Sequence, residues 1–146
     1  MFTHHTDPEY FTSDVFGAGV VHCFSARGGG VSEGYLASLN LGIHRGDLRE
    51  NVLKNYDILG NAVGFDKKAL IFTHQTHTST VVRVDDSNRG QGLVEEVTQE
   101  RDGLITDVPG LALTVFSADC TPVLLYDPVR RAEGKTCALS SPLPSG

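Results

Sequence analysis

LALTVFSADCTPVLLY, residues 111–126, is a strongly apolar stretch that a short polar segment interrupts. Its two apolar ends, residues 111–116 and 122–126, predict buried β-strands. Polar groups between two such strands are unfavourable unless they are hydrogen-bonded or used. Cys120 is therefore a candidate metal thiolate or nucleophile, and Asp119 needs a partner at that depth. The alternative is that Cys120 is a small buried core residue.

The segments around this stretch predict a chain dominated by strands. Further strands are expected at residues 15–25, 69–72, 79–84 and 103–106, where β-branched and aromatic residues gather. Few helices accompany them, so the fold class is α+β or a layered α/β sandwich. The length of 146 residues favours one domain over residues 1–146.

One helix is predicted over Arg49–Val63 by the spacing of its apolar side chains. Asp47 is a suitable N-cap, and Glu50, three residues later, completes a pattern like a capping box. Gly64 is a suitable stop after the last turn.

The charge balance excludes several classes of partner. Twelve Lys and Arg against eighteen Asp and Glu give a net charge of −6. Broad binding to nucleic acids or anionic membranes needs clustered Lys and Arg, so neither is expected. No apolar run approaches the roughly 20 residues of a membrane span. Residues 1–14 lack the pattern of a signal peptide, and the odd cysteine count argues against a disulfide framework, so a cytoplasmic location is expected.

Three further segments carry candidate chemistry. His74 and His77 could bind a metal together, or one could hydrogen-bond locally while the other is exposed. Arg27 and the three glycines that follow it could bind a phosphate or another anion. Alternatively, the segment is an ordinary glycine-rich loop, and Arg27 is a surface residue. Asn40, which has His44 and Asp47 close by in the sequence, could touch a ligand, although a turn is favoured.

The last part of the chain has a different character. Residues 129–146, VRRAEGKTCALSSPLPSG, show no apolar periodicity, although a strand as apolar as residues 122–126 needs something to pack on it. We therefore expect an atypical tail, produced by truncation or by a change of reading frame near Arg130.

Several segments, in order along the chain, resemble one family. They are residues 22–32 (HCFSARGGGVS), 38–42 (SLNLG), Asn51, Val52 and Asn55, residues 75–77 (QTH), 102–107 (DGLITD) and 117–124 (SADCTPVL). The set resembles the laccase-domain family, also called multicopper polyphenol oxidases or peptidoglycan editing factors. Its members are known as purine nucleoside phosphorylases with an adenosine deaminase side activity. The resemblance implies a layered α/β/β/α sandwich that is incomplete at its C-terminal end.

The resemblance also implies roles for named residues. His77 and Cys120 match two of three ligands of a catalytic zinc, or of copper under the older family name, and Asp119 accompanies them as a catalytic residue. A zinc held there would activate water for attack on a purine ring. Substrate and phosphate contacts are implied for four residues, which are Arg27, Ser25, Gly29 and Asn40.

The third family ligand has no counterpart in this sequence. It is a histidine in a His-Ala-Gly-Trp-Arg-Gly motif, whereas this chain has no Trp and no His after His77. His74 or Cys137 could replace it, but neither is expected to. Two ligands hold zinc weakly, so this chain alone is not expected to be competent.

Two other classes of function stay open at this point. In the first, Cys120 is a nucleophile and His77 its base in a hydrolase that edits peptidoglycan. In the second, the chain is an inactive fragment or a binding module, whose sheet edge at residues 122–126 invites self-association. The preferred nucleoside, the choice between zinc and copper, and the oligomeric state are not predicted.

Overall fold

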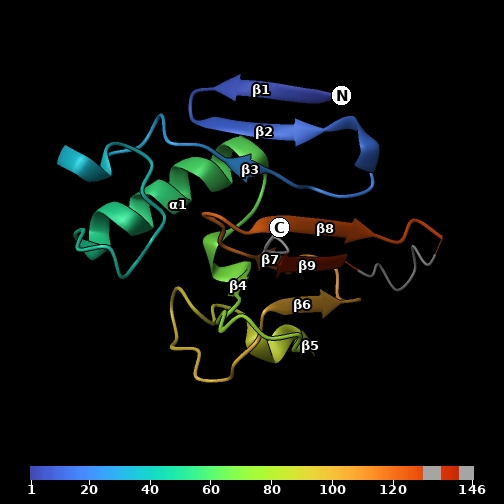
Figure 1. The fold of residues 1–146 in the computed structure, drawn as a ribbon. Helices are drawn as coiled ribbons and strands as arrows, with labels where there is room; N and C mark the ends of the chain where they lie inside the picture. Colours follow the sequence, from blue (N-terminus) through green and yellow to red (C-terminus); the bar gives the residue numbers. More distant parts are fainter. Residues whose placement is uncertain (130–135, 142–146) are drawn as a thin grey trace. The chain divides into compact units, whose positions relative to one another are not determined.

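The computed structural model describes residues 1–129 and the backbone of residues 136–141 (Figure 1). The chain divides into two compact units, Met1–Lys67 and Lys68–Gly146. Across the described residues, one α-helix, short 3₁₀ helices and three sheets confirm the predicted mixed α/β class. No helix within the described part of the chain is long and apolar enough to cross a membrane.

An antiparallel sheet opens the first unit, with the strand order β1-β2-β3. Its strands are β1 (Phe2–Thr6), β2 (Glu9–Ser13) and β3 (Phe24–Ser25). The β1–β2 hairpin was not predicted, because its histidines give the segment a polar character. In the hairpin the His4 ring stacks on Phe11 at 4.6 Å and the His5 ring on Tyr10 at 4.2 Å.

The predicted strand over residues 15–25 is wrong for most of its length. The structure has a 3₁₀ helix, η1 (Asp14–Phe16), then an irregular segment, and only two strand residues in β3. Gly17 has a φ of 57°, which a strand does not tolerate. Val15 and Val21 are 76% and 63% exposed, so their apolar character does not indicate burial here.

The helix α1 (Arg49–Val63) has the predicted bounds. Leu59 on its buried face packs with Tyr10 and Leu39 in the core of the first unit. Gly64 ends the helix in the left-handed conformation, as predicted. The predicted N-cap is wrong, because Leu48 occupies that position and makes no side-chain cap. Another 3₁₀ helix, η2 (Gly34–Leu36), precedes α1, and η3 (Lys67–Ala69) follows it.

Two sheets make up the second unit. In the first, β4 (Leu70–Phe72) pairs in parallel with β7 (Ala112–Thr114). The other sheet has the order β5-β6-β9-β8. Its strands are β5 (Val81–Arg83), β6 (Gly103–Thr106), β9 (Thr136–Ser141) and β8 (Thr121–Tyr126), and η4 (Asp86–Asn88) follows β5. The buried side chains of Ile71, Val84 and Leu104 form the core of this unit.

Strand β9 lies in a segment where the sequence predicted no element. It pairs antiparallel with β6 on one side and with β8 on the other. Backbone hydrogen bonding, rather than an apolar pattern of its own, thus places this segment in the sheet. The rest of the predicted tail beyond residue 129 lies outside the described residues.

Candidate functional site

His77 lies in the loop that follows β4, and its backbone is held by one buried carboxylate. Asp102 is 4% exposed and accepts hydrogen bonds from the His77 backbone N–H at 2.8 Å and from Thr78 Oγ1 at 2.7 Å. It also accepts one from the Thr76 N–H at 3.3 Å. His77 itself is exposed and has a φ of 62°, in the left-handed region. Asp102 therefore fixes a strained turn at this candidate ligand.

The Asp102 carboxylate stays ionised in this position. Burial raises its pKa, but hydrogen bonds from Thr78, Thr76 and His77 favour the charged form. The net pKa lies below its ordinary value. The Asp102 carboxylate thus places a fixed negative charge in contact with the turn of residues 76–78.

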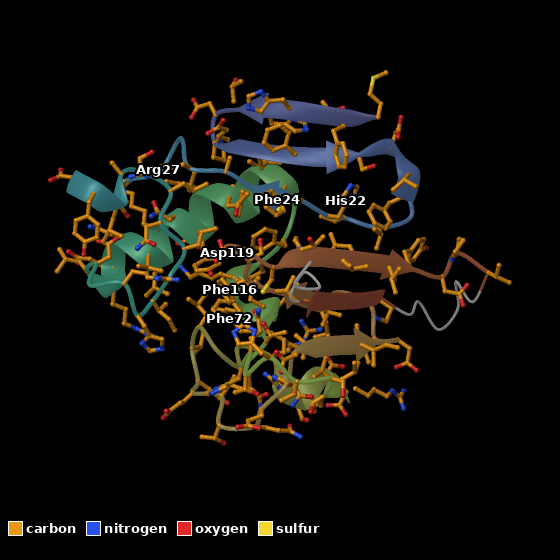
Figure 2. All side chains as sticks on the ribbon, in the orientation of Figure 1. His22, Phe24, Arg27, Phe72, Phe116 and Asp119 are labelled. Atoms are coloured by element: carbon orange, nitrogen blue, oxygen red, sulfur yellow. The ribbon has the colours of Figure 1, made fainter. Side chains whose placement is uncertain are left out.

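Gln75 joins this loop to the segment that leads to Cys120. Its Nε2 donates to the Phe116 carbonyl at 2.9 Å, and its Oε1 accepts from the Phe116 N–H at 2.9 Å. The rings of Phe72 and Phe116 meet edge to face at 5.0 Å, and Figure 2 shows the two side chains together. The candidate loops of His77 and Cys120 are therefore tied to each other through Gln75.

Cys120 immediately precedes β8 and is a free, half-buried thiol. Asp119, which Figure 2 labels in the loop leading into β8, is exposed. The expectation that Asp119 is a buried acid in need of a partner is wrong, because the polar segment lies at the surface. An exposed carboxylate keeps its hydration and needs no protein partner.

His74 takes the local arrangement that was considered as its alternative. Its backbone exchanges hydrogen bonds of 3.0 Å with Arg101, and its Nδ1 lies 2.9 Å from the Val97 carbonyl oxygen. That nitrogen is therefore occupied as a donor to a carbonyl.

The two candidate ligands would supply only part of a metal site. Imidazole nitrogen and thiolate sulfur are both ligands that zinc prefers, and His77 and Cys120 provide one of each. Among the residues that the structure describes, no group of three or more His, Cys, Asp or Glu side chains could hold a metal ion. A catalytic zinc takes three protein ligands, so the described donor set does not fit a complete site.

The candidate phosphate residues belong to the first unit, where protein groups already engage them. The Arg27 Nε donates to the Ala37 carbonyl at 2.5 Å, and its Nη2 donates to the Tyr35 carbonyl at 2.6 Å. Figure 2 shows Arg27 in the loop after β3, and its side chain is exposed. Ser25 is half-buried in β3, opposite Tyr10.

The glycine loop is packed against other backbone segments. The Gly28 and Gly30 N–H groups donate to Glu9 Oε2 at 3.1 Å and to Ser38 Oγ at 3.2 Å. Gly29 has a φ of 87°, and a Cβ there would lie 2.5 Å from the Pro8 Cα. Close approach of the chain to itself accounts for these glycines without a ligand.

Asn40 and Asp47 belong to a polar network that links the glycine loop to α1. Asn40 closes a turn by accepting from the Gly42 N–H at 3.0 Å, as the turn alternative predicted, and donates to Asp47 Oδ2 at 2.9 Å. Ser32 Oγ donates to the same carboxylate at 2.6 Å. Hydrogen bonds from Ser32 and then Asn40 lower the pKa of Asp47 to about 2.

The sequence named the segments of the candidate site but missed two supporting residues. Gln75 and Asp102 were quoted only as parts of matching segments, whereas Asp47 was named both beside Asn40 and as a helix cap. Gln75 lies within the QTH segment, and its place two residues before a candidate ligand is the one signal that could have drawn attention to it.

Comparison with known proteins identifies one family. Residues 21–138 match the family described as multi-copper polyphenol oxidoreductase laccase. The chain is 34% identical over 117 residues to purine nucleoside phosphorylase YlmD of Bacillus subtilis, and 40% identical over 104 residues to a purine nucleoside phosphorylase of Corynebacterium glutamicum. These matches cover 79% and 71% of this chain but only 42% and 41% of the relatives. The chain therefore spans about two-fifths of their length.

Comparison with solved structures identifies the same family. The hypothetical protein YfiH of Bacillus licheniformis superposes with a TM-score of 0.82 and 31% identity, over 92% of this chain and 50% of that one. YlmD of Geobacillus stearothermophilus gives a TM-score of 0.82 and 29% identity, over 96% of this chain and 52% of that one. These likenesses confirm both the resemblance and the mixed α/β fold predicted from the sequence.

Proposed function

The chain belongs to the multi-copper polyphenol oxidoreductase laccase family, and from this membership we propose that its function is purine nucleoside phosphorolysis. One observation carries the proposal: the family match over residues 21–138 contains every candidate residue, and matched relatives are named purine nucleoside phosphorylases. The proposed substrates are phosphate with adenosine, inosine, guanosine or methylthioadenosine. Adenosine deamination is proposed as a second activity.

We assign the phosphate to the loop of Arg27. Its guanidinium is exposed beside the glycine loop, and such a group recognises phosphate oxygens through fixed N–H donors. Ser25, Gly29 and Asn40 are proposed as its neighbours in substrate binding. Because Arg27 also donates to two backbone carbonyls, its role in phosphate binding has to be measured as an effect on the KM for phosphate, beside a measurement of stability.

We assign zinc, with copper as the alternative, to His77 and Cys120. Asp119, exposed beside Cys120, is proposed as a catalytic residue. With two donors among the described residues, this chain is expected to bind zinc weakly and reversibly.

The proposal is tested first by zinc stoichiometry of the purified chain in native mass spectrometry. The Cys120→Ala variant should lose the bound zinc, whereas Cys23→Ala should keep it. Cys23 is a suitable matched control, because burial raises the pKa of its thiol to about 11 and leaves it unreactive. Zinc that is absent from the parent chain, or retained in Cys120→Ala, would contradict the zinc assignment.

Activity is then measured as release of purine base from inosine, with and without phosphate. Release that requires phosphate and is lost in Cys120→Ala supports phosphorolysis. Arg27→Lys should raise the apparent KM for phosphate more than it lowers kcat. Release that does not depend on phosphate would contradict the proposal. Loss of activity on thiol alkylation without any effect of chelators would indicate the cysteine-dependent hydrolase instead.

A further inference from the structure

We infer that Gln75 is a positioning residue, which fixes the segment leading to Cys120 against the loop that carries His77. The inference rests on the proposed function, because it assigns Gln75 to the support of those two ligands. Gln75 lies two residues before His77, and its partner Phe116 lies four residues before Cys120. Its contacts therefore act close to both candidate ligands.

The Gln75 amide takes the place of a peptide group at the end of the β4–β7 pairing. Strands β4 and β7 pair in parallel up to Phe72 opposite Thr114, and the Thr73 N–H still donates to the Thr114 carbonyl at 3.0 Å. Beyond that point the backbones no longer pair as strands. The Gln75 side chain then satisfies both the N–H and the C=O of Phe116, each at 2.9 Å. A primary amide offers the same donor and acceptor as a peptide group, so it continues the ladder.

The Gln75 amide has a fixed orientation. Thr73 Oγ1 donates to Gln75 Oε1 at 2.8 Å, so this oxygen accepts from both Thr73 and the Phe116 N–H. The amide nitrogen must then face the Phe116 carbonyl. Side chains whose rotamers are locked in this way can hold neighbouring groups in one geometry.

The part of the loop that carries His77 is also held in place. Asp102 holds the backbone of residues 76–78 through its three hydrogen bonds, so the loop cannot follow Gln75 if the Phe116 contact is lost. Release of Gln75 should therefore free the Cys120 segment and leave the His77 turn in place. This asymmetry separates a positioning role from general stabilisation.

The first arm of the experiment measures amide hydrogen exchange in the full, zinc-free chain by NMR. Gln75→Leu removes both hydrogen bonds between the amide and Phe116, and protection of the Phe116 N–H should fall about tenfold or more, since this N–H loses its acceptor. Gln75→Glu keeps the acceptor and loses the donor, so it should show a smaller fall and serves if the leucine variant does not fold. Gln99→Leu makes the same change at an exposed position and should have no effect. Unchanged protection of Phe116 in both Gln75 variants would overturn the inference.

The second arm measures zinc affinity by competition with a chromophoric chelator, and the thiolate-to-metal absorption of the cobalt-substituted chain. In Gln75→Leu the affinity should fall about tenfold, as is usual for groups that orient ligands, and the cobalt band should change. Faster exchange at Phe116 with unaltered zinc affinity and an unaltered cobalt band would make Gln75 merely structural and overturn the inference. If the parent chain binds no zinc, the proposed zinc assignment fails. The exchange result then decides alone whether Gln75 holds the segment that leads to Cys120.

Discussion

Asn55 is the buried amide on α1 to which two loops are attached. Its Oδ1 accepts from the Val31 N–H at 2.8 Å, and its Nδ2 donates to Ser32 Oγ and to the Asn40 carbonyl, each at 2.8 Å. Asn55 is 0% exposed, so water cannot replace these partners in the folded state. It thus secures the glycine loop and the 38–42 segment to one helix position.

The variant Asn55→Leu should lower the free energy of unfolding by about 3 kcal/mol or more, because it leaves several buried polar groups unpaired. Urea denaturation followed by circular dichroism measures this loss. Asn61→Leu makes the same change at an exposed position of α1 and should alter stability by less than about 0.5 kcal/mol. Equal effects of the two variants would show that the network is not stabilising.

Asp47 gives the first unit a specific dependence on acid. Hydrogen bonds from Ser32, Asn40 and then Asn51 outweigh desolvation and lower its pKa to about 2. Its contribution to stability is therefore complete above the unfolded pKa, about 3.9, and is lost as the pH falls through about 2.

We expect the unfolding free energy of the parent chain to fall between pH 5 and pH 2.5, and Asp47→Asn to show a shallower fall. In this variant part of the pH dependence of the unfolding free energy should remain, because the pKa values of Asp85 and Asp102 are also lowered. Urea titrations at the two pH values give the comparison. Identical slopes for the parent and the variant would remove Asp47 from the acid response.

The left-handed backbone conformation of His77 can be tested without any ligand. At a φ of 62° a side chain is unfavourable, whereas glycine is not. His77→Gly should therefore be more stable than His77→Ala by about 1 kcal/mol. The same pair at the neighbouring exposed Ser79 should show the opposite order. Thermal unfolding of the four variants decides whether this turn is strained as described.

At the scale of elements, the glycine loop is defined by how closely it approaches the 38–39 backbone. A Cβ at Gly30 would overlap the Ser38 carbonyl and lie 2.5 Å from the Leu39 Cα. Both contacts are with backbone, which cannot move aside as a flexible side chain does. The loop therefore has space for glycine and for no larger residue at this position.

Gly30→Ala should lower stability by about 3 kcal/mol, since overpacking against backbone forces a shift of the whole loop. Gly34→Ala is the matched control: Gly34 has a φ of 61°, with nothing within 4 Å of an added Cβ. Gly34→Ala should lower stability by only about 1 kcal/mol, because an alanine is unfavourable at this positive φ but meets no other atom. Comparable losses in chemical denaturation would argue against close packing at Gly30.

Elements were predictable where one segment carries its own signal. The helix α1 could be predicted, because Val52, Tyr56 and Leu59 repeat at helical spacing and are buried. The β1–β2 hairpin and β9 were not, because their strands are defined by partners elsewhere in the chain. The same holds for the candidate site: Cys120 and His77 stand out locally, whereas Gln75 and Asp102 make contacts with residues 41 and 25 positions away.

At the scale of the whole molecule, each of the two units contains its own buried cluster. Tyr10, Leu39 and Leu59 form the cluster of the Met1–Lys67 unit. Ile71, Val84 and Leu104 form that of the Lys68–Gly146 unit. Compact units of this kind commonly open separately in hydrogen exchange.

A substitution in one buried cluster should therefore affect mainly the unit that contains it. Ile71 is 0% exposed, so Ile71→Ala should lower the opening free energy of its unit by about 3 kcal/mol through lost burial and a cavity. Exchange should then accelerate at the amides of β4, β6 and β7, and change little at those of β2 and α1. Leu59→Ala, at 3% exposure in the other cluster, should give the reverse pattern. Equal acceleration across both units in either variant would show that the chain opens as one cooperative structure, because the loss of a single core would then reach every protected amide.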